Sequence, residues 1–268
     1  MSSPATYELF AVKYAQHERP AVDNFVFRDD VHDGPGPLDY FVWVARSAER
    51  AFVVDTGFSA ATGRRRERTI IRDPKDGLAA LGIDAGQVED VIVTHLHYDH
   101  VGNFEVFPRA TFHLQDREMA YATGRYMGHR RLQMPFDVEN VTGMVREVYR
   151  GRVAFHDGDE ELASGLSLHL VGGHSHGLQF VRVHTARGWV VVASDAAHFY
   201  RNLESGNPFP IVLHVGEMLE GHRKCRRLAA SAQHIVPGHD PLVMQRYPAP
   251  SPELEGIAVR LDVAPAGG

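Results

Sequence analysis

Short apolar runs separated by glycine, proline and polar turn residues recur along most of this chain, a pattern typical of strands. The polar run 46–49 between two of them predicts a hairpin, and residues 74–90 carry apolar residues at a helical period, which predicts a helical crossover. Strands with helices between and around them imply an α/β fold. The runs expected to form strands are residues 7–14, 38–45, 50–54, 91–93, 111–114, 152–156, 166–171, 179–184, 189–193 and 234–236.

The most informative segment follows the apolar run 91–93. Directly after it come three histidines and one aspartate, His95, His97, Asp99 and His100. On a turn that leaves a strand, this spacing can direct His95 and His97 to one metal ion and Asp99 and His100 to an adjacent one. Neutral imidazole and carboxylate are ligands that zinc prefers. The segment therefore predicts a metal site.

Three further candidate ligands stand just past the ends of expected strands, and they are His174, Asp195 and His239. Loops at one edge of a sandwich can converge on a shared site while the sheets hold them rigid. Convergence of several strand ends is stronger evidence for a metal site than any one motif.

This ordered set of residues resembles that of the metallo-β-lactamase superfamily, over about residues 38 to 240. The resemblance implies that the strands fall into two groups and form a four-layer αββα sandwich of two mixed sheets with flanking helices. The turn Asp55-Thr56-Gly57 adds to the resemblance, because the superfamily uses an aspartate at this point to support the site from outside the ligand shell. Among the superfamily's branches, motif order and chain length are most similar to the N-acyl homoserine lactonases, the quorum-quenching lactonases.

The resemblance implies two zinc ions and assigns their ligands. The first ion would be bound by His95, His97 and His174, and the second by Asp99, His100 and His239, with Asp195 bridging the two. A carboxylate bridge and a shared hydroxide hold two metals at about 3.5 to 4 Å. The implied reaction is hydrolysis of a lactone ring by attack of metal-bridging hydroxide, with Asp99 and Asp195 as the catalytic carboxylates.

His198 departs from the lactonase pattern, in which a tyrosine often occupies this position and contacts the substrate carbonyl. An imidazole there can donate a hydrogen bond to substrate or protonate the leaving alkoxide, which would make His198 catalytic. A structural role beside the metal site is the alternative.

Other branches of the superfamily fit the sequence less well. β-Lactamases generally lack an aspartate at the position of Asp195, and glyoxalase II has glutathione-binding basic residues after its last histidine, where the tail 251–268 has Arg260 as its only cation. Oxygen-reducing diiron relatives usually have a carboxylate where this chain has His97. A hydrolase of another lactone or ester, or a glyoxalase II-like thioesterase, stays open as an alternative to the acyl-homoserine lactonase. A metal protein without catalysis is a weaker alternative.

Composition limits the range of partners. A chain of 268 residues with 44% hydrophobic content can bury one large core, so we expect residues 1–268 to form a single domain. The net charge of −6 argues against a nucleic-acid partner. No export signal and no apolar span of membrane length is evident, so we expect a cytoplasmic protein with a small-molecule substrate and no membrane association. The one dense basic run, residues 64–68, is expected to be solvated rather than to bind an anion.

Two segments stand outside the expected sandwich. Residues 16–37 are rich in proline and glycine and predict a long loop that caps the site. Residues 116–149 contain four of the seven methionines, together with aromatic residues. This segment is expected to be ordinary core, an adaptable apolar wall for a substrate tail, or a contact in a homodimer.

Several further histidines and the single cysteine are expected to have structural roles. His176 lies two residues from His174, but the position after the glycine pair favours His174 as the ligand. Cys225 is expected to be an inert thiol in a helix. His32, His129 and His214 cannot be assigned. The histidines expected to pack or to form hydrogen bonds within strands are His113, His156, His169 and His184.

Overall fold

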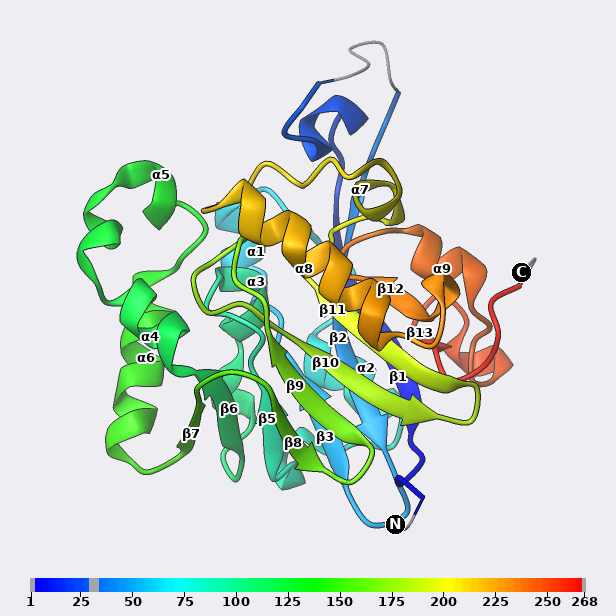
Figure 1. Ribbon diagram of the computed structural model, residues 1–268. Helices are drawn as coiled ribbons and strands as arrows, with labels where there is room; N and C mark the ends of the chain where they lie inside the picture. Colours follow the sequence, from blue (N-terminus) through cyan, green and yellow to red (C-terminus); the bar gives the residue numbers. More distant parts are fainter. Residues whose placement is uncertain (1–2, 29–33, 267–268) are drawn as a thin grey trace.

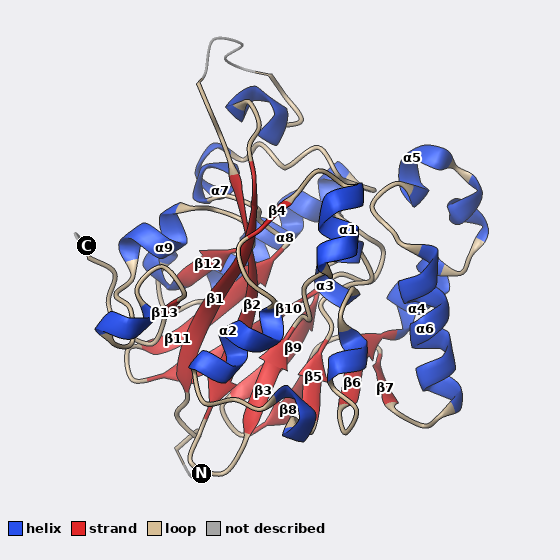
Figure 2. Cartoon of the chain, turned by 180° about the vertical axis from the view of Figure 1, so that it is seen from behind, coloured by secondary structure: helices blue, strands red, loops and turns tan. Residues whose placement is uncertain are grey.

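The computed structural model describes residues 3–28 and 34–266 (Figure 1). Two mixed sheets lie face to face with helices on both outer faces, as the four-layer prediction expects (Figures 1 and 2). In strand order, the first sheet consists of β13 (Ala258–Arg260), β1 (Glu8–His17), β2 (Leu38–Arg46), β3 (Ala51–Val54), β5 (Asp90–Ile92), β6 (Thr111–Gln115) and β7 (Val153–His156), with β4 (Thr69–Ile70) paired to β1. The second consists of β12 (Ile235–Pro237), β11 (Gly188–Ser194), β10 (Gln179–Thr185), β9 (Leu166–Leu170) and β8 (Glu160–Ala163).

The helices are short apart from two. The α-helices are α1 (Ala60–Arg65), α2 (Pro74–Ala80), α3 (Tyr98–Val101), α4 (Asp116–Ala122), α5 (Arg130–Gln133), α6 (Val138–Tyr149), α7 (Tyr200–Ser205), α8 (Val215–Leu228) and α9 (Leu242–Arg246). The 3-10 helices are η1 (Ala21–Asn24), η2 (Ala85–Gln87), η3 (Phe104–Val106), η4 (Arg125–Gly128), η5 (Ala232–His234) and η6 (Pro252–Leu254). Within the described ranges, no helix combines the length and the apolar character needed to cross a lipid bilayer.

Alternation along the strands produces the layers. On β1, Leu9 and Ala11 face the second sheet and join the cluster between the sheets, whereas Phe10 and Val12 face the opposite side and pack with α2 residues such as Leu78. On the second sheet, Phe180 and Val191 pack outward against the face covered by α8. Three apolar clusters therefore separate four layers.

The sequence predicts most elements, and the differences lie at short or polar ones. The hairpin between β2 and β3 is confirmed, and the crossover before β5 consists of α2 and η2 in place of one continuous helix. Three short strands were not predicted from the sequence: β4, β8 and β13. Strand β1 continues to His17, since it pairs with β2 as far as Leu38.

Carboxyl ends of strands from both sheets meet at one edge. β3 and β5 run parallel in the first sheet, and β11 and β12 run parallel in the second. Each of these four strands leads directly into residues that the sequence singles out: Asp55, His95, Asp195 and His239. The edge is where the candidate site lies.

Candidate metal centre

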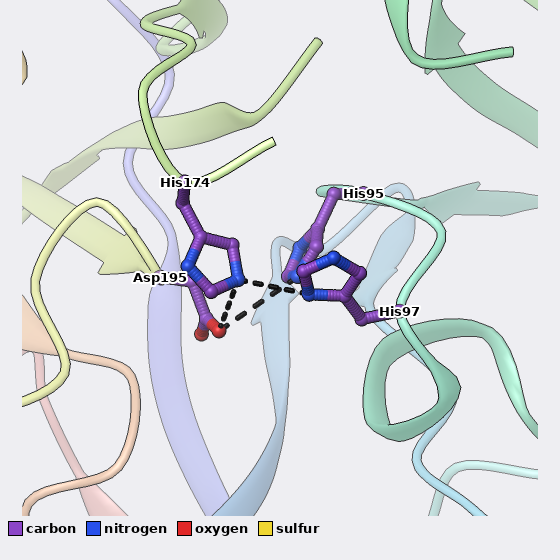
Figure 3. Close-up of side chains that lie close together, drawn as sticks. All are labelled: His95, His97, His174 and Asp195. Carbon is purple, nitrogen blue, oxygen red and sulfur yellow. Dashed lines mark hydrogen bonds and ion pairs between the residues drawn. The ribbon is translucent and has the colours of Figure 1, made fainter. Parts of the chain in front are cut away.

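Four side chains from three loops form the first group of candidate ligands. Figure 3 shows His95, His97, His174 and Asp195 pointing toward one another, and all four are buried. Nε2 of His174 lies 2.9 Å from Nδ1 of His97 and 3.0 Å from Oδ2 of Asp195. Nε2 of His95 lies 3.7 Å from the same carboxylate oxygen. Potential ligand atoms thus surround one point.

Asp99, His100 and His239 form the second group. Oδ2 of Asp99 lies 3.8 Å from Nε2 of His100 and 3.9 Å from Nε2 of His239. His100 and His239 are buried, and 11% of the Asp99 side chain is exposed. This group has an edge that solvent or a small molecule can reach.

Asp195 lies between the two groups and turns one oxygen to each. Its Oδ2 faces His95 and His174, whereas its Oδ1 lies 3.0 Å from Nε2 of His239 and 3.3 Å from Nε2 of His100. A carboxylate in this position can bridge two metal ions. The structure therefore gathers all seven residues that the sequence singles out as ligands.

Contacts behind the ligands orient the histidine rings. Nδ1 of His174 donates to the carbonyl oxygen of Ile211 at 2.6 Å, and Nδ1 of His239 donates to that of Asp39 at 2.9 Å. Nδ1 of His100 donates to Asp55, with 2.7 Å between the nitrogen and Oδ2. With Nδ1 protonated, Nε2 is the atom free to bind metal, and it is the atom that points inward.

Asp55 is fixed by the strand it ends. Its carboxylate also accepts hydrogen bonds from the backbone N–H of Thr94 at 2.8 Å and from the Thr94 hydroxyl at 2.9 Å. The side chain is fully buried, and its backbone φ of 62° lies in the left-handed region, which costs energy for a residue with a Cβ. The hydrogen bonds offset this strain and hold the turn after β3 against the turn after β5.

The donor set fits metal ions. Nε2 of His95 and Nε2 of His100 are buried and have no hydrogen-bond partner among the described residues, a costly state that a metal ion would relieve. Burial lowers the pKa of His95 and His97 well below the usual value, so both rings are neutral, as metal binding requires. Burial alone would raise the pKa of the Asp195 carboxyl. The surrounding imidazoles, those of His198 and His100 first, hold this pKa well below its ordinary range.

His198 lies inside this constellation. Its Nε2 lies 3.1 Å from Oδ2 of Asp195, and its ring stacks on Phe209 with 3.8 Å between the ring centroids. Asp195, His198 and His239 also lie close enough together to form a third potential ligand group. Burial lowers the pKa of His198 to about 3 despite the neighbouring Asp195, which leaves a neutral ring whose Nδ1 has no hydrogen-bond partner in the described structure.

Glu118 is a supporting residue that sequence reasoning missed. This carboxylate, at the third position of α4, is completely buried and accepts hydrogen bonds from the backbone N–H groups of Leu96 and Gly177, each at 2.9 Å. Leu96 lies between two ligand histidines, and Gly177 lies three residues after His174. Glu118 thus ties together the two loops that carry the first ligand group. Nothing in its local sequence distinguishes it from a surface glutamate.

The other histidines lie away from the site. His176 is exposed, which agrees with the choice of His174. His129 is exposed, His214 caps α8, and His32 falls outside the described residues. The predicted strand histidines form hydrogen bonds: His113 to Asp90, His156 to Glu160, His169 to Ser167 and His184 to the Ala5 carbonyl.

Cys225 fits its predicted role. The thiol is buried on α8, and burial raises its pKa to about 12 although Lys224 and Arg226 oppose this effect. A thiol in that state is a poor nucleophile.

The methionine-rich segment contacts the metal motif. Phe136 forms a β-bridge with His97, and their rings meet edge to face at 4.6 Å between centroids. A cavity of about 150 Å³ beside His97 and His174 is lined partly by this segment and partly by Ile211 and Leu213. Met144 is buried core, but 51% of Met134 is exposed, so the segment provides both core and cavity wall.

The described parts of the predicted capping loop contact Pro208 and Phe209, on another side of the site. The backbone N–H of Val26 donates to the Pro208 carbonyl at 2.8 Å, and the guanidinium of Arg19 lies over the ring of Phe209 at 5.0 Å. Phe209 is the residue on which His198 stacks. This segment therefore reaches the site through one intervening side chain.

Comparison with known proteins agrees with this geometry. The family model of the metallo-β-lactamase superfamily matches residues 35–247. The chain belongs to that superfamily. A chain described as a quorum-quenching N-acyl homoserine lactone lactonase superposes with a TM-score of 0.74 over 90% of this chain and 95% of its own, at 19% identity. AidC, described as a dizinc quorum-quenching lactonase, gives a TM-score of 0.71 at 18% identity, covering 90% of each chain.

Curated relatives share part of their length with the chain. N-acyl homoserine lactonase AttM of Azorhizobium caulinodans is 30% identical over 172 residues, which is 60% of this chain and 62% of that protein. Metallo-beta-lactamase domain-containing protein 1 of Homo sapiens is 28% identical over 182 residues, or 67% of this chain and 57% of the relative. The chain thus spans less than two thirds of each. The expected resemblance to the superfamily and to its acyl-homoserine lactonases is confirmed.

Proposed function

We propose that the chain is a metal-dependent hydrolase that binds two zinc ions and opens the ring of a lactone, with N-acyl homoserine lactones as its substrates. The observation that carries the proposal is the position of Asp195, with one carboxylate oxygen toward each of two histidine-rich groups. Structural zinc sites are closed by four protein ligands on one ion, whereas seven ligands shared between two ions leave room for water and substrate. This arrangement suits a catalytic metal site better than a structural zinc site that only stabilises the fold.

The chain's own residues supply binding, orientation and exclusion of water. His95, His97 and His174 would hold one ion, the group of Asp99 would hold the other, and Asp195 would bridge them. Zinc ions bound there would lower the pKa of water toward neutrality and polarise an ester carbonyl. Asp55 and two backbone carbonyl groups keep the rings of His100, His174 and His239 in one tautomer, so their orientation is set before substrate arrives.

The walls of the site support a substrate with an apolar part. The small cavity beside His97 and His174 is lined by Tyr121, Leu132 and Ile211 among others, all with apolar surface. A lactone bound at the metal site would place its acyl substituent against this wall. The names of the relatives point to the same substrate class.

We assign His198 the role of positioning the Asp195 carboxylate. Its Nε2 lies within hydrogen-bond distance of Asp195, and stacking on Phe209 fixes the ring plane. Donation of this N–H leaves the bridging carboxylate in one orientation. A direct contact with substrate is the second role that its location permits.

Side-by-side assays of different ester classes test the proposal. The zinc-loaded protein is mixed with acyl-homoserine lactones of short and long chain, with γ-butyrolactone and with a glutathione thioester, and acid release is followed. Chelator-sensitive turnover of the acylated lactones supports the proposal. Turnover confined to the thioester would favour the glyoxalase II-like alternative, and turnover confined to unacylated lactones would favour another lactone.

A further inference from the structure

A second, larger cavity lies beside the metal site. Its volume is about 860 Å³, within the range of ligand pockets, and it is enclosed by α1, the segment from η4 to α5, and the start of α6. Figure 2 shows α1 facing α5 and α6 across this region. We call it the arginine groove, because four arginines line it: Arg65, Arg66, Arg130 and Arg131.

The groove is apolar between its arginines. Met127, Phe136 and Val141 contribute to its surface, and Met134 lines it with half of its side chain exposed. Apolar surface flanked by guanidinium groups is complementary to a molecule with a hydrocarbon chain and an anionic end. An uncharged acyl chain would form no ion pair with the arginines.

Two of the four arginines form contacts within the protein. Arg65 pairs with Asp137, the one carboxylate that lines the described groove. Arg66 donates to the carbonyl oxygens of Met134 and Phe136 and lies over the ring of Tyr98. These contacts hold the groove's two walls together.

Arg130 and Arg131 are the arginines available to a ligand. Both are exposed on α5, and neither forms an ion pair or hydrogen bond with any side chain of the described residues. They stand in a chain whose net charge is −6, so this cationic surface is local and not a consequence of an overall basic composition. Guanidinium groups bind carboxylate and phosphate with two parallel hydrogen bonds.

The arginine groove adjoins the smaller cavity beside the metal site. Arg131 and Met134 line both this groove and the smaller cavity that reaches His97 and His174. A substrate tail that extends from the two histidines toward the arginine groove would therefore pass Met134 and Arg131.

We propose that the preferred substrate carries an anionic group at the far end of its acyl chain, and that Arg130 and Arg131 bind this group in the arginine groove. The proposal rests on the proposed lactone hydrolysis and adds the chemical class of the substrate tail. Arg130 and Arg131 then determine specificity without touching the reacting atoms, so they act on KM.

Matched substrates test the charge at the tail. Acyl-homoserine lactones ending in a carboxylate and in the isosteric carboxamide are compared at several chain lengths. At the best length, we expect a KM about tenfold lower for the carboxylate in low salt, and a smaller difference in 0.5 M NaCl. Arg130→Gln/Arg131→Gln should remove the preference by raising the KM of the carboxylate substrate. Equal KM values for the two tails in the native protein would overturn the proposal.

A control variant and a binding measurement complete the test. Arg223→Gln/Arg227→Gln removes the same charge from exposed positions on α8 and should leave the preference intact. Titration calorimetry with decyl sulfate, below its micelle concentration, reports on the groove without turnover. The Kd should rise about tenfold in the α5 variant and stay constant in the α8 variant.

The two proposals fail in distinguishable ways. Absence of turnover on every lactone, with decyl sulfate bound through Arg130 and Arg131, would reject the lactonase assignment and retain an anion-binding groove. Lactone turnover with no effect of the α5 variant on decyl sulfate binding or on KM would reject the groove alone.

Discussion

Oδ2 of Asp55 lies 2.7 Å from Nδ1 of His100, and both side chains are buried. The pair joins the end of β3 to the turn after β5, so the first sheet itself orients a ligand of the second metal group. Since Asp55 also binds Thr94 twice, its carboxylate has little freedom to move. The orientation of His100 is therefore set by the fold before any metal binds.

Asp55→Asn should weaken metal binding selectively. The amide cannot hold the His100 ring as a carboxylate does, and loss of such support typically lowers metal affinity 10- to 100-fold. We expect the loss to fall on the group of Asp99, His100 and His239. Competition with a chromophoric chelator measures the affinity of each ion.

A second variant separates this effect from loss of a histidine-bound carboxylate in general. Asp90→Asn also removes a carboxylate bound to a histidine on the first sheet, because Asp90 lies 3.0 Å from His113. It should leave both metal affinities unchanged. Equal losses in the two variants would argue against a specific role for Asp55.

Asp195→Ala should disrupt both metal groups together. Oδ1 and Oδ2 face different groups, so one substitution removes a ligand atom from each. Metal content by plasma mass spectrometry should fall for both ions and hydrolysis should be lost. Retention of two metals per chain with full turnover would contradict the bridging position.

His198→Phe should retain metal and lose turnover. The phenyl ring can keep the stacking on Phe209, but it cannot donate to Asp195. We expect kcat to fall about 10- to 100-fold, the range for loss of a residue that supports a metal ligand, with two ions still bound. If metal is lost instead, His198 acts as a ligand, and if kcat is unchanged, the residue is structural only.

Stability should depend on His222 below neutral pH. Burial and then Arg226 lower its pKa from 6.5 to about 4 in the folded state, so the unfolded chain binds the proton more readily. The stabilisation is fully present above pH 6.5 and is lost as the pH falls toward 4. Between pH 7.5 and 5, His222→Gln should remove about 2 kcal/mol of the pH dependence of unfolding.

Urea titration of the metal-free protein at the two pH values measures this difference. Metal-free protein is used because proton competition for the ligands would add its own pH dependence. His129→Gln, a change at an exposed position, should leave the pH dependence of the free energy of unfolding as in the native protein. An identical pH dependence in the native protein and His222→Gln would show that His222 is not the group responsible.

The ligands were predictable from the sequence because their signal is local. Each follows an apolar strand, and loops at strand ends on one edge can converge. The sequence and its resemblance to the superfamily therefore predict a shared site for His95, His174 and His239. Glu118 could not be predicted, since its role depends on two backbone N–H groups brought to it by distant loops. The same holds for the carbonyl of Asp39, which orients His239 from the start of β2.

The arginine groove shows a similar limit. The basic run 64–68 is predicted to be solvated. The sequence does not show which other segments of the fold lie opposite it. Packing of α1 against the segment after α4 brings Arg65 and Arg66 opposite Arg130 and Arg131. Strands β4 and β8 were missed for a related reason, since their partners and not their own residues define them.

Stepwise addition of zinc to metal-free protein, with hydrolysis of an acyl-homoserine lactone measured at each step, tests the central claim most directly. A site with Asp195 between two ligand groups predicts binding of two zinc ions per chain and full activity only when the second has bound. Full activity with one ion per chain would contradict the two-metal site, and binding of two ions with no lactone hydrolysis would contradict the proposed activity.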